Sequence, residues 1–82
     1  MIAHNPKELA LFIKSYRKKQ GLKQSDVSDA VGLKQATMSA FENNPATTKI
    51  DTLFRILSAT NLDIHITPKN ETTDSSGWHE EW

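Results

Sequence analysis

The chain has 82 residues, with ten Lys and Arg, ten Asp and Glu, three His and no Cys. This length predicts one small domain with a thin core, for which oligomerisation is a common source of added stability. The absence of cysteine excludes disulfides and thiolate zinc sites. No apolar run approaches the roughly 20 residues that cross a bilayer, and the N-terminus has no basic region followed by an apolar run, so we expect a cytoplasmic protein.

The balanced net charge hides an asymmetry along the chain. All ten Lys and Arg lie within residues 1–69 together with six acidic residues, which leaves this part at +4, whereas the four acids of residues 70–82 give −4. A basic body favours a polyanionic partner and an acidic tail does not. Charge alone favours nucleic-acid binding only slightly, because charged faces are also simply solvated.

The first predicted helix begins at Asn5, which can cap it, and Pro6 fits its first turn while Glu8 completes a capping box. Its apolar positions follow the helical period and are Leu9, Phe12, Ile13 and Tyr16. Gly21 ends the helix, and the basic residues of its last turn suit the helix dipole.

Three more helices follow in the sequence pattern. The first covers residues 24–31 with Gly32 after it, and the next covers residues 35–43, where Asn44 and Pro45 stop it. The last begins near residue 48 or 49 and ends at Asn61. Its predicted apolar stripe is Ile50, Leu53, Phe54 and Leu57, with Ile56 beside it.

The period then changes to an alternation of apolar and polar residues over 62–67, which predicts a strand with Leu62, Ile64 and Ile66 on one face, stopped by Pro68. A single strand cannot satisfy its own backbone, and the chain offers no second one. We therefore expect antiparallel pairing with the same strand of a second copy, in a homodimer. The alternative is an irregular segment packed on the body.

These elements predict a mostly α fold, a small helical bundle with one C-terminal strand. Residues 1–68 form one predicted folded domain that includes the dimerisation strand. Residues 69–82, KNETTDSSGWHEEW, are rich in Ser, Thr, Asp and Glu and read as a flexible acidic tail.

Residues 24–43, QSDVSDAVGLKQATMSAFEN, fit a helix-turn-helix unit of two short helices joined through a glycine. Ser28 lies where the helices approach most closely and Gly32 takes the turn, where a left-handed backbone costs glycine little. The side chains expected to point inward are Val27, Val31, Leu33, Met38 and Phe41. The alternative is an ordinary helical hairpin within a bundle.

In such a unit the second helix enters the major groove with its N-terminal residues at base edges, which makes Lys34 and Gln35 the candidate base readers. The free backbone N–H groups at the start of the helix that begins at Gln24 suit a phosphate. The candidate backbone contacts are Arg17, Lys18, Lys19, Gln24, Ser25, Thr37 and Ser39. For each residue the alternative is a solvated polar side chain.

No catalytic constellation competes with this interpretation. His4, His65 and His79 are scattered without a metal-ligand spacing, and there is no phosphate-binding glycine loop. We expect no enzyme, no metal site and no cofactor.

Gln24 to Pro45 is similar to the helix-turn-helix of the phage-repressor-like (Cro, cI or XRE) family, in which a glutamine commonly opens each of the two helices, as Gln24 and Gln35 do here. GLKQATMSAFENNP, the single strand and the final Glu-Trp together resemble the HipB family of antitoxins. The resemblance implies a dimer that binds operator DNA, represses its own operon and binds a HipA-like serine/threonine kinase toxin. Two departures are Lys23 and Lys34, which stand where Ser or Thr is common.

The acidic tail carries two tryptophans, Trp78 and Trp82, although it is too polar to build a core. The resemblance implies that Trp82, and Trp78 with it, anchors the tail on the toxin, because a buried Trp contributes strongly to an interface. The alternative is a tail that folds back on the domain. Two other functions remain open: a stand-alone phage-type repressor without a toxin, and a helix-turn-helix module that binds only proteins.

Overall fold

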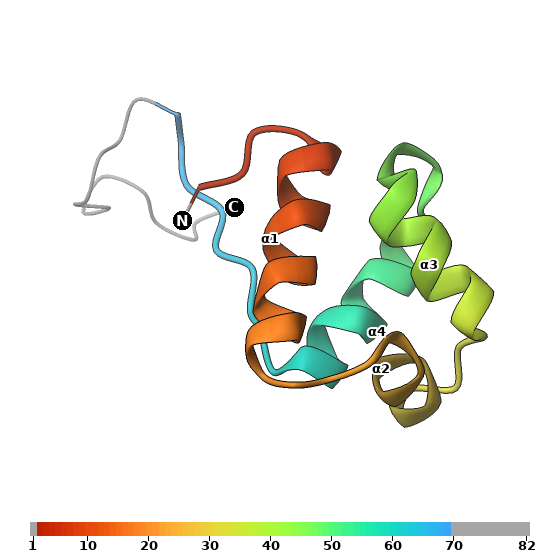
Figure 1. The fold of residues 1–82 in the computed structure, drawn as a ribbon. Helices are drawn as coiled ribbons and strands as arrows, with labels where there is room; N and C mark the ends of the chain where they lie inside the picture. Colours follow the sequence, from red (N-terminus) through yellow and green to blue (C-terminus); the bar gives the residue numbers. More distant parts are fainter. Residues whose placement is uncertain (1, 70–82) are drawn as a thin grey trace.

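The computed structural model describes residues 2–69, and these residues are mostly helical, as the sequence predicts (Figure 1). The helices pack around one another, with a short 3-10 turn, η1, before the last of them. Their bounds are α1 Pro6–Lys19, α2 Gln24–Ala30, α3 Gln35–Asn43, η1 Pro45–Thr47 and α4 Ile50–Thr60. The predicted helices agree with these bounds to within two residues at each end.

The start of α1 is fixed by two reciprocal hydrogen bonds. The Asn5 side chain accepts from the Glu8 backbone N–H at 2.8 Å, which satisfies one of the free donors of the first turn. The Glu8 carboxylate accepts from the backbone N–H of His4 at 2.8 Å, one residue earlier than the usual capping box. The predicted cap is therefore confirmed, with its return bond shifted by one residue.

The core lies where the inner faces of all four helices meet. The fully buried apolar side chains are Ala10, Ile13, Val27, Met38, Phe41, Ile56 and Leu57. Thr60 is also buried, and its hydroxyl donates to the Ile56 carbonyl at 2.9 Å, so that no buried polar group is left unsatisfied there.

The predicted apolar stripe of α4 is wrong in its orientation. Leu53 is half-buried and Ile56 and Leu57 are buried, but Ile50 is 70% exposed and Phe54 is 56% exposed. The helix is turned so that Thr60 joins the core in their place, because its hydroxyl can bond to the preceding turn of its own helix. α4 therefore presents two large apolar side chains to solvent.

The turns that follow α1 and α2 depend on left-handed glycines. Gly21 has φ +76° and Gly32 has φ +71°, a region that is costly for a residue with a Cβ. After each glycine the backbone N–H bonds back across the turn, from Leu22 to the Arg17 carbonyl at 3.1 Å and from Leu33 to the Ser28 carbonyl at 2.8 Å. These bonds satisfy carbonyls that the helix ends leave free.

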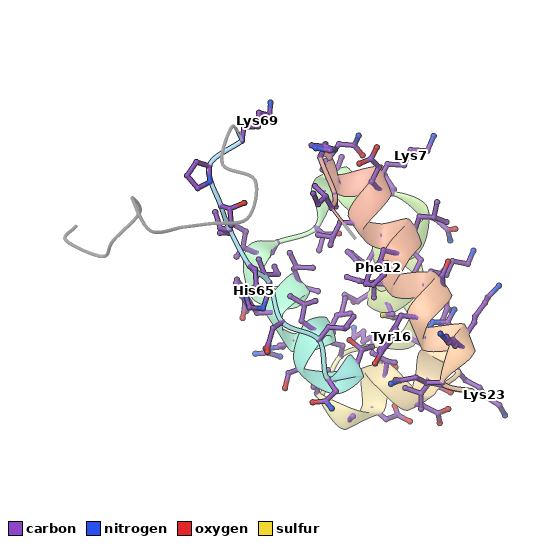
Figure 2. All side chains as sticks on the ribbon, turned by 90° about the vertical axis from the view of Figure 1, so that its left-hand side faces the viewer. Lys7, Phe12, Tyr16, Lys23, His65 and Lys69 are labelled. Atoms are coloured by element: carbon purple, nitrogen blue, oxygen red, sulfur yellow. The ribbon has the colours of Figure 1, made fainter. Side chains whose placement is uncertain are left out.

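Residues 62–68 run extended along the side of the molecule that is remote from α3 (Figure 1), and the described residues form no strand ladder. The predicted strand is therefore not confirmed: residues 62–68 are extended but have no ladder partner among the described residues. With residues 2–6, α1 and α4 it borders an apolar groove of about 790 Å³. Phe12 and Tyr16 project from α1 toward this side, with ring centroids 6.2 Å apart (Figure 2).

Within residues 2–69, no helix has the length and apolar character that crossing a membrane requires.

We expect Gly32→Ala to lower the free energy of unfolding by about 1–2 kcal/mol, because Ala is strained at this positive φ. No atom lies within 4 Å of the position where its Cβ would be, so the loss reflects backbone conformation and not a clash. Gly32→Asn is the matched control, since Asn tolerates the left-handed region better, and it should lose less than half as much in urea unfolding. Equal stability of Gly32→Ala and the wild type would contradict a left-handed backbone conformation at Gly32.

Candidate nucleic-acid interface

α2 and α3 form the helix-turn-helix that the sequence predicts, and their inner faces fix how α3 is presented. Val27 and Met38 are fully buried, and Ser28 is buried with them because only a small side chain fits between the two helices. Val31 and Leu33, expected to point inward, are only half-buried at the turn. The close packing makes α2 and α3 a rigid pair.

The N-terminus of α3 is open to solvent and electropositive. Lys34 is the N-cap residue but makes no side-chain cap, and the first turn contains no acidic residue. The Thr37 N–H donates to the Lys34 carbonyl at 3.0 Å, so it is the N–H groups of Gln35 and Ala36, which precede any intrahelical partner, that keep their capacity to bind an anion. The helix dipole adds positive potential. Lys34 and Gln35 are both exposed at this end, where the sequence predicts the base readers.

The outward side of α3 carries small and polar side chains. Ala36 and Ala40 are exposed, and Thr37 and Ser39 are half-buried with their hydroxyls on this helix. Asn43, which the sequence analysis does not single out, donates to the Ser39 hydroxyl at 3.2 Å from the next turn. Small residues let a helix approach a surface closely, as insertion into a groove requires.

Arg17 does not occupy the position expected of a phosphate contact. It is 6% exposed. Its Nε and Nη2 donate to the two carboxylate oxygens of Glu42 at 2.7 and 3.0 Å, and its Nη1 donates to the Leu22 carbonyl at 2.8 Å. The expectation that Arg17 contacts DNA is corrected to a structural role, because its guanidinium is spent on joining α1 to α3.

The same carboxylate also holds Gln24 at the start of α2. Gln24 Nε2 donates to Glu42 Oε1 at 3.0 Å, so one carboxylate joins residues from α1, α2 and α3. The next residue, Ser25, is half-buried, and α2 has no side-chain cap from Lys23. The hydrogen bond to Glu42 therefore fixes the Gln24 side chain at the start of the helix-turn-helix. A residue that contacts the backbone of a nucleic acid needs such a fixed position.

Glu42 keeps its negative charge in spite of its burial. Its side chain is only 1% exposed, and burial alone raises the pKa of a carboxyl group. Hydrogen bonds from Arg17 and Gln24, with the positive charges of Arg17 and Lys14, outweigh this effect and hold the pKa of Glu42 below its ordinary value. The buried pair is therefore ionised at neutral pH.

Glu42 is the residue of this region that sequence reasoning missed. A signal was present, because Arg17 follows Ile13 by four positions and Ile13 is fully buried, which places both on the inner face of α1. An arginine on an apolar helix face needs a carboxylate partner, since an unpaired buried charge is costly. Lys18 and Lys19, the other predicted contacts on α1, are exposed.

The remaining predicted sites divide between the described residues and the tail. Leu62 is half-buried beside the core, whereas Ile64 is 38% and Ile66 is 85% exposed. Trp78 and Trp82 lie outside the described residues. Among residues 2–69, no group of His, Asp and Glu could hold a metal ion.

Comparison with known proteins gives one consistent result. The helix-turn-helix family model matches residues 13–66. Antitoxin HipB of Escherichia coli (strain K12) is 38% identical over 74 residues, which span 89% of this chain and 84% of that protein. The ImmF control region 10 kDa protein of Bacillus phage phi105 is 34% identical over 65 residues, or 79% of this chain and 72% of that protein.

Solved structures with the same fold include a chain of the HipA-HipB-O2-O3 complex. It has a TM-score of 0.82 and 36% sequence identity, and the match covers 84% of this chain and 97% of that chain. The HipB-O4 20mer complex gives the same values. The agreement extends over most of the residues that the structure describes.

We expect Arg17→Leu to lower the free energy of unfolding at pH 7 by about 3–5 kcal/mol, because it leaves the Glu42 carboxylate buried without its partner. The pKa of Glu42 is lowered in the folded chain, so its stabilisation is present at neutral pH and is lost as pH falls through that pKa. The difference from the wild type should therefore narrow as pH falls below the ordinary pKa of a glutamate toward the lowered pKa of Glu42. Lys18→Ala, at the next and exposed position, should change stability little; urea unfolding at several pH values measures both, and equal effects would contradict the structural role.

Proposed function

Because the chain belongs to the HipB antitoxin family of helix-turn-helix proteins, we propose that it is a sequence-specific DNA-binding repressor and an antitoxin. In this proposal it represses its own operon and restrains a HipA-like serine/threonine kinase toxin. One observation carries the DNA-binding part: the exposed, uncapped N-terminus of α3 bears Lys34 and Gln35 on a rigid support.

The proposed base readers match the chemistry of the major groove. Lys34 can donate to the O6 and N7 acceptors of guanine, and Gln35 can bond adenine N6 and N7 with its amide. Both side chains are exposed, and they lie at the end of α3 that enters the groove in helix-turn-helix proteins. Packing of Met38 and Phe41 in the core supports the helix from behind.

The proposed contacts with the DNA backbone come from α1, α2 and α3. Lys18 and Lys19 would supply charge, and Gln24 and Ser25 would meet a phosphate at the start of α2. Thr37 and Ser39 would contribute hydroxyls from α3. Arg17 acts through Glu42, which holds Gln24 in position. Because such contacts displace counterions from DNA, binding should weaken steeply with salt.

The proposed active form is a homodimer that pairs residues 62–67 of two copies as antiparallel strands. Support comes from the apolar side chains that one chain leaves exposed beside the groove: Ile2, Ile50, Phe54 and Ile66 are between 56% and 85% exposed. A second copy would cover them. Two half-sites would then lie about 34–36 Å apart, or a multiple of this distance.

The proposed partner in the second role is a HipA-like kinase, and the tail residues Trp78 and Trp82 are its proposed anchor. One relative of this fold is named as part of a HipA-HipB complex. A tryptophan that fills a pocket of a partner contributes strongly to an interface, which is the support for this anchor.

We expect Gln35→Ala to cost about 1–3 kcal/mol on the operator and to relax the preference at one base pair, because it removes a bidentate contact. Gel shifts with operator and scrambled DNA measure both effects. The matched control is Gln20→Ala, the same exchange at an exposed residue after α1, which should leave both affinities unchanged. An equal loss on operator and scrambled DNA would remove Gln35 from the base readers.

We expect a chain that ends at Lys69 to lose or weaken its hold on a HipA-like kinase, because it lacks both tryptophans. Co-purification of this chain and the full chain from native lysate measures the difference. Retention of operator binding by the shortened chain is the control for folding. If neither chain retains a kinase, the stand-alone repressor remains; if neither binds DNA in a salt-dependent way, the protein-interaction module does.

A further inference from the structure

The extended segment carries an acidic residue and a histidine two positions apart. Asp63 and His65 are both exposed and lie on the opposite side of the segment from Ile64, since successive side chains of an extended chain alternate. Figure 2 shows His65 on this segment. Ile64 is 38% exposed and lines the groove with Leu62 and Ile66, and the groove is also bordered by Asp63 and His65. This arrangement rests on the homodimer proposed above.

Two-fold symmetry restricts how two identical antiparallel strands can pair. One residue, or one gap between residues, must lie on the axis, and its neighbours then face each other in a fixed order. An axis between residues would place apolar side chains opposite polar ones and turn one face away from the groove. Only a residue on the axis keeps the apolar face of both strands together. An axis at Leu62 would bring the end of α4 into the pairing, and an axis at Ile66 would bring in Pro68, which has no N–H to donate. Asp63, Ile64 or His65 is therefore the central residue.

Charge separates these three registers. With Asp63 on the axis, it faces the partner's Asp63, and like charges directly opposite each other are destabilising. With His65 on the axis, it faces the partner's His65, and Asp63 faces the partner's Thr67. With Ile64 on the axis, Asp63 faces the partner's His65, and symmetry repeats this pair.

We infer that Asp63 and His65 select the register of the dimer, with Ile64 on the two-fold axis and two Asp63–His65 pairs across the strands. The aspartate accepts a hydrogen bond from the imidazole N–H of its neighbour, in either protonation state of the ring. The apolar face of the same ribbon, Leu62, Ile64 and Ile66, closes the groove of about 790 Å³ in each copy. The occupant of the groove is thus a second copy of this chain.

The test compares the dimer dissociation constants of full-length variants by sedimentation equilibrium at pH 7.5. His65→Glu should raise the constant on the order of tenfold, because it sets a carboxylate opposite Asp63 twice in each dimer. The double variant Asp63→Lys/His65→Glu should return to within about threefold of the wild type, because it restores opposite charges with reversed polarity. Thr67→Glu is the matched control: it adds the same charge to the same face, but opposite the partner's Asn61.

A double variant that dimerises as weakly as His65→Glu would overturn the register. So would a Thr67→Glu variant whose dissociation constant rises as much as that of His65→Glu, because Asp63 faces the partner's Thr67 only when His65 lies on the axis. All substituted residues are exposed, so each variant should keep the wild-type thermal transition at concentrations where it is monomeric. A wild-type chain that stays monomeric throughout would reject the proposed dimer together with this register. If all variants form dimers with the dissociation constant of the wild type, the register alone is rejected.

Discussion

The ion pair between Arg17 and Glu42 joins three helices, and the shape of the surface around α3 depends on it. Arg17 leaves α1 on its inner face and binds both carboxylate oxygens of Glu42 on α3, while Gln24 of α2 shares one of these oxygens. The Arg17 guanidinium also donates to the Leu22 carbonyl and so holds the turn after α1. Buried charge pairs contribute little net stability when compared with apolar packing, but they restrict a structure to arrangements in which both charges are satisfied. Here that arrangement fixes the start of α2 relative to α3.

Local chemistry made the helices predictable, because their ends depend on neighbouring residues. Asn5 caps α1, Gly21 and Gly32 take left-handed turns, and Pro45 follows α3. Each of these helix ends is therefore determined by residues within a few positions of it. The role of Arg17 could not be read in the same way, because its partner lies 25 residues away. A run of basic residues at a helix end is typical of solvated or DNA-binding surface. The spacing of Arg17 from Ile13 indicates the inner face of α1, but only the packing of α3 against α1 identifies Glu42 as its partner.

The misjudged face of α4 has a different origin. Ile50, Leu53, Phe54 and Leu57 satisfy the helical period as well as the true core positions do, since the helix carries apolar residues on more than one side. A period chooses among faces only when the other faces are polar. The excess apolar surface of α4 lies next to that of the extended segment, with Phe54 and Ile64 bordering one small hollow. The failed prediction therefore points to a surface that one chain cannot bury alone. The placement of Lys34 and Gln35 was predictable, because the end of a helix that follows a glycine turn is exposed in any packing of the pair.

The extended segment and the open end of α3 lie on opposite sides of the molecule, with α1 and α4 between them (Figure 1). The proposed contacts between copies and the proposed contacts with the DNA major groove therefore do not compete for the same surface, and the dimer would determine where the two copies of α3 meet the DNA. An antiparallel strand advances about 3.4 Å per residue, so moving the central residue from Ile64 to His65 slides one copy past the other by about 6.8 Å. This distance is comparable with two base-pair steps of about 3.4 Å each. In the proposed dimer, the residue on the two-fold axis would therefore set the separation of the two copies of α3. Related chains could then bind half-sites at different spacings through changes in residues 62–67 alone, with α3 unchanged.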